Sequence, residues 1–353
     1  MTSPAEPPVL LRREGRAAYL VLNRPRAINA LTHEMVGLIR TALEQWAEDD
    51  VRTVVLTGAG ERGLCAGGDI VAMWRDAKAG GSENAAFWAD EYRLNALIAD
   101  YPKPYVAIMD GIVLGGGIGL SAHAGQRVVT ERSRIGMPET GIGFLPDVGG
   151  TYLLAHAPGE TGTHLGLTAG SVGAGDAIAT GFADHFVPSD GIPALLADLA
   201  VRDADEALAA AEQAAPPSPL VEARSWLDPA YAGDDPVAIV ERLRALGHEE
   251  ATRAAAAIEA KSPTSVRVTL RALREAARMT SLQPALDLEY RLAMRFHTSH
   301  DFVEGVRAQV VDKDRDPKWS PARLADVADN DVAAYFAPLG ERELGLAGTG
   351  DKN

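Results

Sequence analysis

The chain has 353 residues, of which 46% are hydrophobic and 24% charged, so it can form one or two globular domains with a sizeable core. Acidic residues outnumber basic ones by 49 to 34, and the formal charge of −15 argues against a nucleic-acid partner, which needs a basic face. The sequence contains no run of 18 apolar residues, so we expect no membrane-spanning helix.

Hydrophobic periodicity predicts alternating strands and helices over the first 130 residues. Strands are expected at 9–12, 17–22, 53–57, 105–109 and 127–130, and helices at 32–49, 84–98 and 115–123. Thr32 is expected to cap the first of these helices, because its hydroxyl can accept a backbone N–H. This alternating order is typical of α/β folds that are built from βαβ crossovers.

The composition changes near residue 215, where the segment 215–219 contains three prolines and is the best linker candidate. Beyond it, helical patterns are expected at 236–246, 249–260, 264–279 and 283–297. The sequence therefore predicts an α/β core over residues 1–214, followed by a helical C-terminal region over residues 215–353.

A single cysteine, Cys65, excludes an internal disulfide, and no pair of cysteine and histidine has the spacing of a zinc site. We therefore expect no metal. The first eight residues have neither the apolar segment of a secretory signal nor the Arg-rich pattern of a transit peptide. Together these features predict a reduced, cytoplasmic setting.

Three short motifs resemble known binding or catalytic motifs, but each lacks a residue or a structural element that the motif requires. The segment 58–63 matches the dinucleotide pattern G-x-G-x-x-G, but Gly67 and Gly68 downstream would break the helix that such a motif opens. The segment 119–123 resembles a hydrolase nucleophile elbow, but it ends in histidine and lies in a predicted helix. The segment 312–316 lacks the glycine and the glutamate of a calcium loop. We interpret them as a loop, a helix-packing segment and a charged surface turn, and Cys65 as a packing residue.

Two glycine-rich turns, at 65–70 and 111–119, each follow a predicted strand. Glycine allows the backbone to point N–H groups at a ligand oxygen, and a helix N-terminus favours negative charge. If the two turns converge, they can form an oxyanion hole. The alternative interpretation is close packing between helices and strands.

A third stretch, residues 137–151, contains two carboxylates, Glu139 and Asp147, in otherwise apolar surroundings rich in glycine and proline. Carboxylates without compensating charges are costly in such surroundings, and their pKa values tend to shift. A surface loop would be more polar, so we take Glu139 and Asp147 as candidates for acid–base chemistry.

With these motifs the sequence resembles the crotonase (enoyl-CoA hydratase/isomerase) superfamily and, within it, the 3-hydroxyisobutyryl-CoA hydrolases. The resemblance is carried by residues 23–31, 65–70, 115–117 and 138–150, with a late match over 301–319. It implies an α/β fold of the ClpP/crotonase type, with a ββα spiral core and a C-terminal helical extension. It also implies an acyl-CoA substrate and no cofactor beyond the CoA of that substrate.

The resemblance favours a hydrolase over a hydratase. Hydratases of the superfamily use two glutamates; the first position is Gly119 here and the second is Glu139. Loss of one acid–base group is expected to cost roughly 10²–10⁴-fold in rate. The hydrolase pattern instead pairs the retained glutamate with an aspartate eight residues later, which matches Asp147, and it includes Glu91 as a contact to the substrate.

The resemblance implies a role for each residue. The backbone N–H groups of Gly68 and Gly116 stabilise the oxyanion. Glu139 either attacks the carbonyl to give a mixed anhydride or acts as general base for water. Asp147 binds the 3-hydroxyl or positions water, and Glu91 orients the polar acyl end. The expected reaction is hydrolysis of 3-hydroxyisobutyryl-CoA, or of a close β-hydroxyacyl-CoA, in valine breakdown.

Residues expected by resemblance to bind CoA are Arg26, Ala27, Ala66, Gly68, Asp69 and Ile70. Since CoA carries phosphates, this acidic chain needs a local basic spot, for which Arg26 is the candidate. Two alternatives remain open: an enoyl-CoA hydratase or isomerase that uses Glu139 alone, and a catalytically silent acyl-CoA-binding protein. Members of the superfamily often form homo-oligomers, so a homo-oligomer is possible here. The sequence leaves the oligomeric state of this chain open.

Overall fold

The computed structural model describes residues 6–349, so the first five residues of the segment inspected for a leader lie outside it. The chain forms two compact units that interleave along the sequence. Unit 1 comprises Met1–Gly68, Leu94–Ile135 and Val172–Ser218; unit 2 comprises Asp69–Arg93, Gly136–Ser171 and Pro219–Asn353. The predicted boundary at residues 214/215 lies near one of their junctions, and the predicted division into core and extension stays a prediction.

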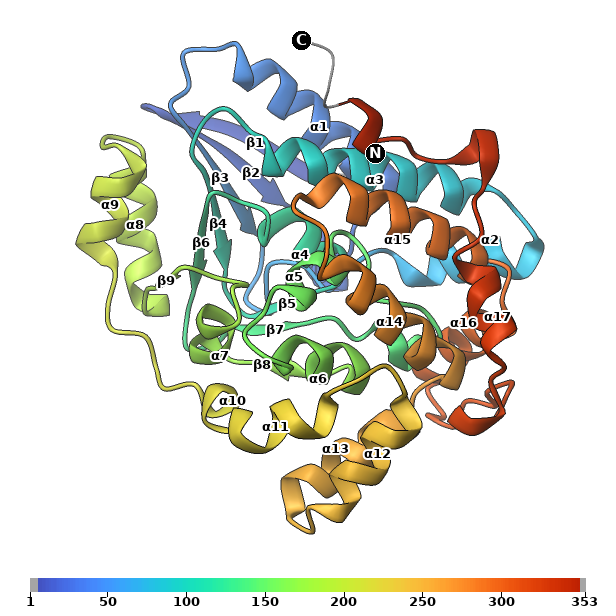
Figure 1. Ribbon diagram of the computed structural model, residues 1–353. Coiled ribbons are helices and arrows are strands. Elements are labelled where there is room, and N and C mark those ends of the chain that lie inside the picture. Colours follow the sequence, from blue (N-terminus) through green and yellow to red (C-terminus); the bar gives the residue numbers. More distant parts are fainter. Residues whose placement is uncertain (1–5, 350–353) are drawn as a thin grey trace. The chain divides into compact units, whose positions relative to one another are not determined.

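Unit 1 contains a six-stranded sheet with the order β1-β2-β3-β4-β6-β9 (Figure 1). Its strands are β1 (Val9–Glu14), β2 (Ala17–Leu22), β3 (Thr53–Gly58), β4 (Tyr105–Met109), β6 (Gln126–Val129) and β9 (His185–Phe186). β1 and β2 form an antiparallel hairpin, and all other neighbours are parallel. The continuous apolar runs of β3 and β4 fit strands that are buried on both faces.

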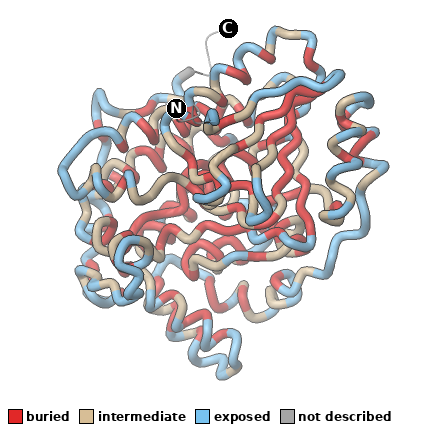
Figure 2. Tube along the Cα trace, turned by 180° about the vertical axis from the view of Figure 1, so that it is seen from behind, coloured by how far each residue is buried: buried red, intermediate tan, exposed pale blue. Residues whose placement is uncertain are grey.

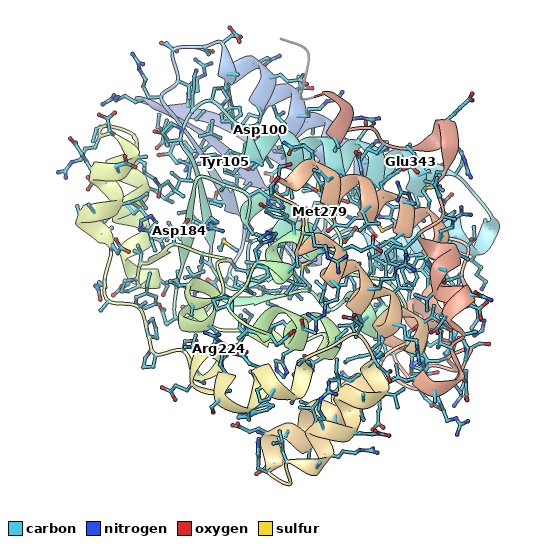
Figure 3. All side chains as sticks on the ribbon, in the orientation of Figure 1. Asp100, Tyr105, Asp184, Arg224, Met279 and Glu343 are labelled. Carbon is cyan, nitrogen blue, oxygen red and sulfur yellow. The ribbon has the colours of Figure 1, made fainter. Side chains whose placement is uncertain are left out.

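The helices of unit 1 are α1 (His33–Ala47), α4 (Gly116–Ser121), α7 (Ala174–Ala179), α8 (Ile192–Leu199) and α9 (Ala204–Ala211). Thr32 caps α1 as predicted, since its hydroxyl accepts the N–H of Met35. One core cluster joins β2, β3 and β4 to α8 and α9, through residues such as Tyr19, Val55 and Leu195. Figure 3 labels Asp184, whose carboxylate pairs with Arg127 of β6. Asp184 directly precedes β9, so this pair links the start of β9 to β6.

A second, three-stranded sheet has the order β5-β7-β8. Its strands are β5 (Ile112–Leu114), β7 (Arg134–Gly136) and β8 (Ser171–Val172). β5 matters for the site because it leads directly into the glycine turn that begins α4.

Unit 2 is mainly helical. Its earlier helices are α2 (Ile70–Ala79), most of α3 (Glu83–Ala99), α5 (Gly150–Ala155) and α6 (Thr161–Thr168), with the short 3₁₀ helix η2 (Glu139–Ile142) between α3 and α5. The later ones are α10 (Pro219–Glu222), α11 (Arg224–Tyr231), α12 (Pro236–Ala245), α13 (Glu249–Glu259), α14 (Pro263–Ala276), α15 (Leu282–Phe296), α16 (His300–Val306) and α17 (Asp329–Tyr335). α12 and α13 each have a buried and an exposed face (Figure 2).

An aromatic core stabilises unit 2 around Phe144. The ring of Phe144 stacks on Trp88 of α3 at 5.3 Å and contacts Phe296 of α15 and Phe302 of α16 at 5.6 and 5.4 Å. Aromatic pairs at these distances add to the stabilisation from burial alone. This core lies directly beside η2 in the chain, so it anchors the turn that carries Glu139.

The predicted elements are all present, with ends that differ by a few residues. No prediction covered α2, the short helices between residues 150 and 211, or α10, α11, α16 and α17. None of the described helices is long and apolar enough to cross a membrane.

Candidate active site

The two predicted glycine turns lie against one another within unit 1. The N–H of Cys65 donates to the carbonyl of Ile112 at 3.2 Å, and the N–H of Leu114 donates to the carbonyl of Cys65 at 3.0 Å. A Cβ at Gly117 would approach the Cys65 carbonyl to 2.6 Å, so only glycine fits there. A Cβ at Gly67 would lie 3.7 Å from the Gly116 nitrogen. The turns therefore converge, as an oxyanion hole requires.

The two N–H groups expected to form this hole are available. Gly116 is the first residue of α4, and the preceding Gly115 adopts a positive φ of 49°. Among the described residues, neither the N–H of Gly116 nor that of Gly68 has a hydrogen-bond acceptor. Unsatisfied N–H groups at a helix start can bind a ligand oxygen. Their role in catalysis stays a prediction.

Four buried carboxylates gather in unit 2. Glu139 begins η2, Asp147 lies in the turn before α5, Glu91 lies on α3, and Glu289 lies on α15. Glu139 and Asp147 are each 6% exposed, and Glu289 is fully buried. Burial of several carboxylates together is costly unless protons or hydrogen bonds compensate.

Hydrogen bonds fix two of these carboxylates. The Tyr92 hydroxyl donates to Oδ2 of Asp147 at 2.6 Å. Glu289 accepts the N–H of Gly149 at 2.6 Å and the N–H and hydroxyl of Thr151. By contrast, Oε2 of Glu139 and Oε1 of Glu91 are buried and have no hydrogen-bond partner among residues 6–349. The role of these two oxygens toward a substrate stays a prediction.

Burial, followed by the charge of Asp147, raises the pKa values of Glu139 and Glu91 well above the usual range. Burial raises the pKa of Asp147 to about 7, although the Tyr92 hydrogen bond lowers it. Burial raises the pKa of Glu289 to about 8 against its hydrogen bonds to Thr151 and Gly149. Asp147 and Glu289 therefore exchange protons near neutral pH, as groups that perform acid–base catalysis do. Among the described residues, no group of histidine, cysteine, aspartate and glutamate is arranged to hold a metal ion.

The residues expected to bind CoA are divided between the units. In unit 1, Arg26 and Ala27 are exposed on the short helix Pro25–Ala27, and Arg62 donates to the Arg26 carbonyl at 2.6 Å. The N–H of Ala66 is already bonded to the Ile28 carbonyl at 2.9 Å.

The remaining CoA candidates lie at the start of α2 or directly before it. In unit 2, Asp69 caps α2 by accepting the N–H of Ala72, and Ile70 is the first residue of that helix. Gly68, the last residue of unit 1, offers its backbone N–H as described above. Nothing further in the structure assigns these residues to CoA, so that role stays a prediction.

The structure agrees with the structural interpretations given above to residues 119–123, to Cys65 and to residues 312–316. Ser121 lies in α4 and donates to the Gly117 carbonyl one turn earlier, so it is a helix residue and not an exposed nucleophile. Cys65 is fully buried and forms no disulfide. Asp312 and Asp314 both pair with the Arg307 guanidinium, in a charged surface turn.

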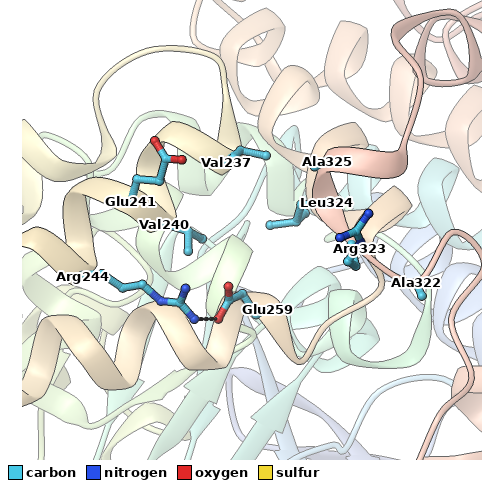
Figure 4. Close-up of a pocket in the computed structure, with 9 residues that line it drawn as sticks. All are labelled: Val237, Val240, Glu241, Arg244, Glu259, Ala322, Arg323, Leu324 and Ala325. Atoms are coloured by element: carbon cyan, nitrogen blue, oxygen red, sulfur yellow. Dashed lines mark hydrogen bonds and ion pairs between the residues drawn. The ribbon is translucent and has the colours of Figure 1, made fainter.

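One pocket of unit 2, of about 290 Å³, lies away from all predicted site residues (Figure 4). Two of its charged groups form an ion pair, in which Arg244 binds Glu259 at 2.6 Å. Its lining residues are Val237, Val240, Glu241, Arg244, Glu259, Ala322, Arg323, Leu324 and Ala325. It supplies none of the carboxylates described above.

Two functional candidates, Tyr92 and Glu289, were missed by reasoning from the sequence. A signal for Glu289 existed: it occupies a position of the apolar stripe of α15, four residues after Ala285 and three before Leu292, where a charge is unexpected. Tyr92 had no such signal, because α3 is apolar on several sides.

Comparisons with known proteins agree over nearly the whole chain. A family model described as enoyl-CoA hydratase/isomerase matches residues 17–336. The chain is 41% identical to a protein of Danio rerio and 37% identical to one of Homo sapiens, both named mitochondrial 3-hydroxyisobutyryl-CoA hydrolase. The aligned regions cover 98% and 95% of this chain, and 94% and 90% of the relatives.

Two solved structures are similar in fold and sequence. One, described as a carnitinyl-CoA dehydratase from Mycobacterium thermoresistibile, has a TM-score of 0.93 at 52% identity and covers 97% of this chain and 99% of its own. The other, described as an enoyl-CoA hydratase from Rhodobacter sphaeroides, has a TM-score of 0.91 at 43% identity and covers 96% and 99%. The predicted α/β fold class is confirmed.

The expectation of a cytoplasmic location is wrong. The curated relatives are named as mitochondrial proteins, which contradicts it. A single cysteine excludes a disulfide but does not distinguish one reducing compartment from another.

Proposed function

Because the chain belongs to the enoyl-CoA hydratase/isomerase family, whose crotonase fold it has, we propose that it hydrolyses a short β-hydroxyacyl-CoA thioester. The first candidate substrate is 3-hydroxyisobutyryl-CoA, after which the relatives at about 40% identity are named. One observation carries the proposal: Glu139 and Asp147 are buried together with raised pKa values, whereas the first hydratase position is Gly119, buried inside α4.

The glycine turns of unit 1 would form the oxyanion hole of the proposed reaction. In unit 1 the N–H groups of Gly68 and Gly116 would donate to the thioester oxygen, which gains negative charge as the carbonyl carbon becomes tetrahedral. Loss of one such donor typically costs about 10²–10³-fold in rate. Both donors are backbone groups, so no side-chain truncation removes them.

In unit 2 Glu139 would act on the carbonyl carbon. As a general base it takes a proton from water while the water oxygen attacks, the C–S bond breaks, and the CoA sulfur leaves as thiolate. As a nucleophile it forms an anhydride that water then cleaves. Either route consumes one water and releases the acid and CoA, and it needs no cofactor beyond the CoA of the substrate. The raised pKa makes Glu139 a stronger base than an exposed glutamate.

Asp147 and Glu91 would recognise the acyl group. Asp147 has a pKa of about 7 and is held by Tyr92, so it can bind the 3-hydroxyl or a water. Glu91 presents a buried oxygen without a partner. On the CoA side, the exposed Arg26 next to Arg62 supplies the basic spot that phosphate groups require. A substrate of this kind fits valine breakdown.

A second candidate function is dehydration of a β-hydroxyacyl-CoA, favoured by 52% identity to the structure described as a carnitinyl-CoA dehydratase. An acyl-CoA panel separates the two, because hydrolysis releases a thiol and dehydration produces a conjugated enoyl thioester. We expect rapid thiol release from 3-hydroxyisobutyryl-CoA. Enoyl product without free CoA would reject the hydrolase.

The Glu139→Gln variant tests whether the chain is an enzyme at all. We expect a loss of roughly 10²–10⁴-fold in kcat, the usual contribution of a positioned acid or base. Unchanged turnover would remove Glu139 from the mechanism. No turnover in either protein, together with tight acyl-CoA binding, would indicate a silent binding protein.

A further inference from the structure

The turn that carries Asp147 has an unusual backbone. Val148 adopts a positive φ of 53° and Gly149 one of 81°, in two consecutive residues. A β-branched residue rarely adopts this conformation, so the surrounding structure must hold it there. α5, which begins at Gly150, receives no cap from its own N-terminal residue.

Glu289 supplies the missing cap from a helix that is distant in sequence. Its Oε2 accepts the Gly149 N–H at 2.6 Å, and its Oε1 accepts the Thr151 N–H at 2.8 Å and the Thr151 hydroxyl. Both carboxylate oxygens are therefore used on the segment that immediately follows Asp147. On the other side, Tyr92 donates to Asp147 itself.

We propose that Glu289 is a positioning residue for the reaction, which holds the strained turn so that Asp147 meets the 3-hydroxyl of the substrate. This proposal rests on the proposed function. Glu289 itself touches no substrate atom in it, since its two oxygens are occupied by the turn. Asp147 is the residue that recognises the acyl group, and Glu289 acts through it.

A purely structural role explains Glu289 poorly. A fully buried carboxylate beside the charge of Asp147 is costly, and that charge raises its pKa further. An apolar residue in this stripe of α15 would serve the packing of the fold better. A carboxylate is needed where several N–H and O–H donors of one turn must be held at once, because it accepts with both oxygens.

The first variant is Glu289→Gln, which replaces one acceptor oxygen by an amide group that can only donate. We expect kcat for 3-hydroxyisobutyryl-CoA to fall about 10²-fold, the typical cost of misplacing a reacting group by about 1 Å. The KM should change far less, because most of the binding contacts are made by CoA. The preference for 3-hydroxyisobutyryl-CoA over isobutyryl-CoA, which lacks the hydroxyl, should be lost.

A milder pair of variants remains informative if Glu289→Gln fails to fold. Thr151→Val removes only the hydroxyl that donates to Glu289, and it should weaken the same preference to a smaller extent. Thr151→Ser keeps the hydroxyl and should restore it. A purely structural role would not move this preference.

Asp287→Asn is the matched control, since Asp287 lies on the same helix. Its two oxygens cap another segment by accepting the N–H groups of Leu346 and Ala347 at 2.8 and 2.9 Å. It should leave both kcat and the preference unchanged.

The inference is overturned if Glu289→Gln and Thr151→Val lower only the melting temperature, and wild-type kcat and preference persist. It is equally overturned if Asp287→Asn has the same effect on preference as Glu289→Gln. A wild-type protein that dehydrates but releases no thiol refutes the proposed function instead. The same variants, with the kcat and KM for 3-hydroxyisobutyryl-CoA as readouts, then test Glu289 on the reaction that is observed.

Discussion

Glu139 and Asp147 are both buried carboxylates of unit 2, yet two different kinds of support hold them. The turn of Glu139 is held by close backbone packing against α16. A Cβ at Gly143 would lie 2.0 Å from the Asp301 carbonyl oxygen, and a Cβ at Gly305 would lie 2.4 Å from the Ile142 carbonyl carbon. The turn of Asp147 is held instead by the hydrogen bonds of Glu289 and Tyr92 described above.

The difference gives the late sequence match a physical role. Asp301 begins this stretch, and its carboxylate accepts the Ser262 hydroxyl at 2.6 Å and the Ser320 N–H at 2.8 Å. These bonds place α16 directly against the turn of Glu139. Packed backbone tolerates no added volume, whereas a turn held by hydrogen bonds depends on donors, acceptors and protons. The two supports should therefore fail under different perturbations.

The largest effect is expected from Gly143→Ala. Gly143 has a φ of 74°, which costs an alanine about 1 kcal/mol, and the contact with Asp301 adds about 1–3 kcal/mol of overpacking. We expect the free energy of unfolding to fall by about 2–4 kcal/mol and kcat by at least about 10²-fold, because Glu139 shifts with the turn. Urea unfolding and thiol release measure the two effects.

Gly247→Ala is the matched control for this variant. Gly247 has nearly the same φ, 72°, but nothing lies within 4 Å of its added Cβ. It therefore retains the backbone strain and lacks the clash. If both variants lose equal stability and Gly143→Ala keeps wild-type kcat, close packing does not support Glu139.

Sequence reasoning located the elements whose residues carry a local pattern. The continuous apolar runs at residues 53–57 and 105–109 predicted β3 and β4, and the 3.6-residue period predicted α14 and α15. It missed α5 and α6, which are short, glycine-containing and without a clear amphipathic period. Interleaved units also leave no local trace, since each is assembled from stretches far apart in sequence.

For the site, the same distinction applies. Glu139 and Asp147 were noticeable as carboxylates in an apolar stretch, and the glycine turns as clustered glycines. Glu289 lies 138 residues from Thr151, its partner in the turn, and Tyr92 lies 55 residues from Asp147. Pairings over such sequence distances depend on the folded arrangement and have no local pattern. The candidate acid–base residues were thus easier to predict than the residues that hold them in place.

The second prediction concerns the hydrogen-bonded support. Tyr92→Phe removes the hydroxyl that lowers the pKa of Asp147, so this pKa should rise above its value of about 7. A hydrogen bond to a charged group is worth about 1.5–3 kcal/mol, so we expect an upward shift of about one pH unit or more. Activity at pH 7 should fall about fivefold or more, since the ionised fraction of Asp147 falls from about one half to about one tenth, and it should recover as the pH increases.

A profile of kcat/KM between pH 5 and 9 measures this shift. Tyr290→Phe is the control, because its ring packs edge-on against Tyr92 at 6.3 Å while its hydroxyl bonds the Ala85 carbonyl and not Asp147. Identical profiles for Tyr92→Phe and the wild type would show that this bond does not hold the ionised Asp147. The Tyr92 hydrogen bond would then not count as a support of Asp147.

The smallest expected effect is the dependence of stability on pH. It distinguishes most directly between the packed turn of Glu139 and the hydrogen-bonded turn of Asp147. In the folded protein the pKa of Asp147 is about 7 and that of Glu289 about 8, both raised by burial above their usual values near 4. The folded state thus keeps protons that the unfolded chain has already lost. Between about pH 5 and 8 the free energy of unfolding should therefore fall as pH rises, since deprotonation is cheaper in the unfolded chain.

Melting temperatures of the wild type and two variants across this range test the point. Asp147→Asn cannot ionise, so its curve should be flatter and should approach or exceed the wild type near pH 8. Gly143→Ala introduces only strain and volume, and its curve should run below the wild type by a constant amount. Parallel curves for all three would mean that Asp147 does not contribute to the pH dependence. The loss of an ionisable group must change the slope of the curve, whereas a steric defect changes only its level.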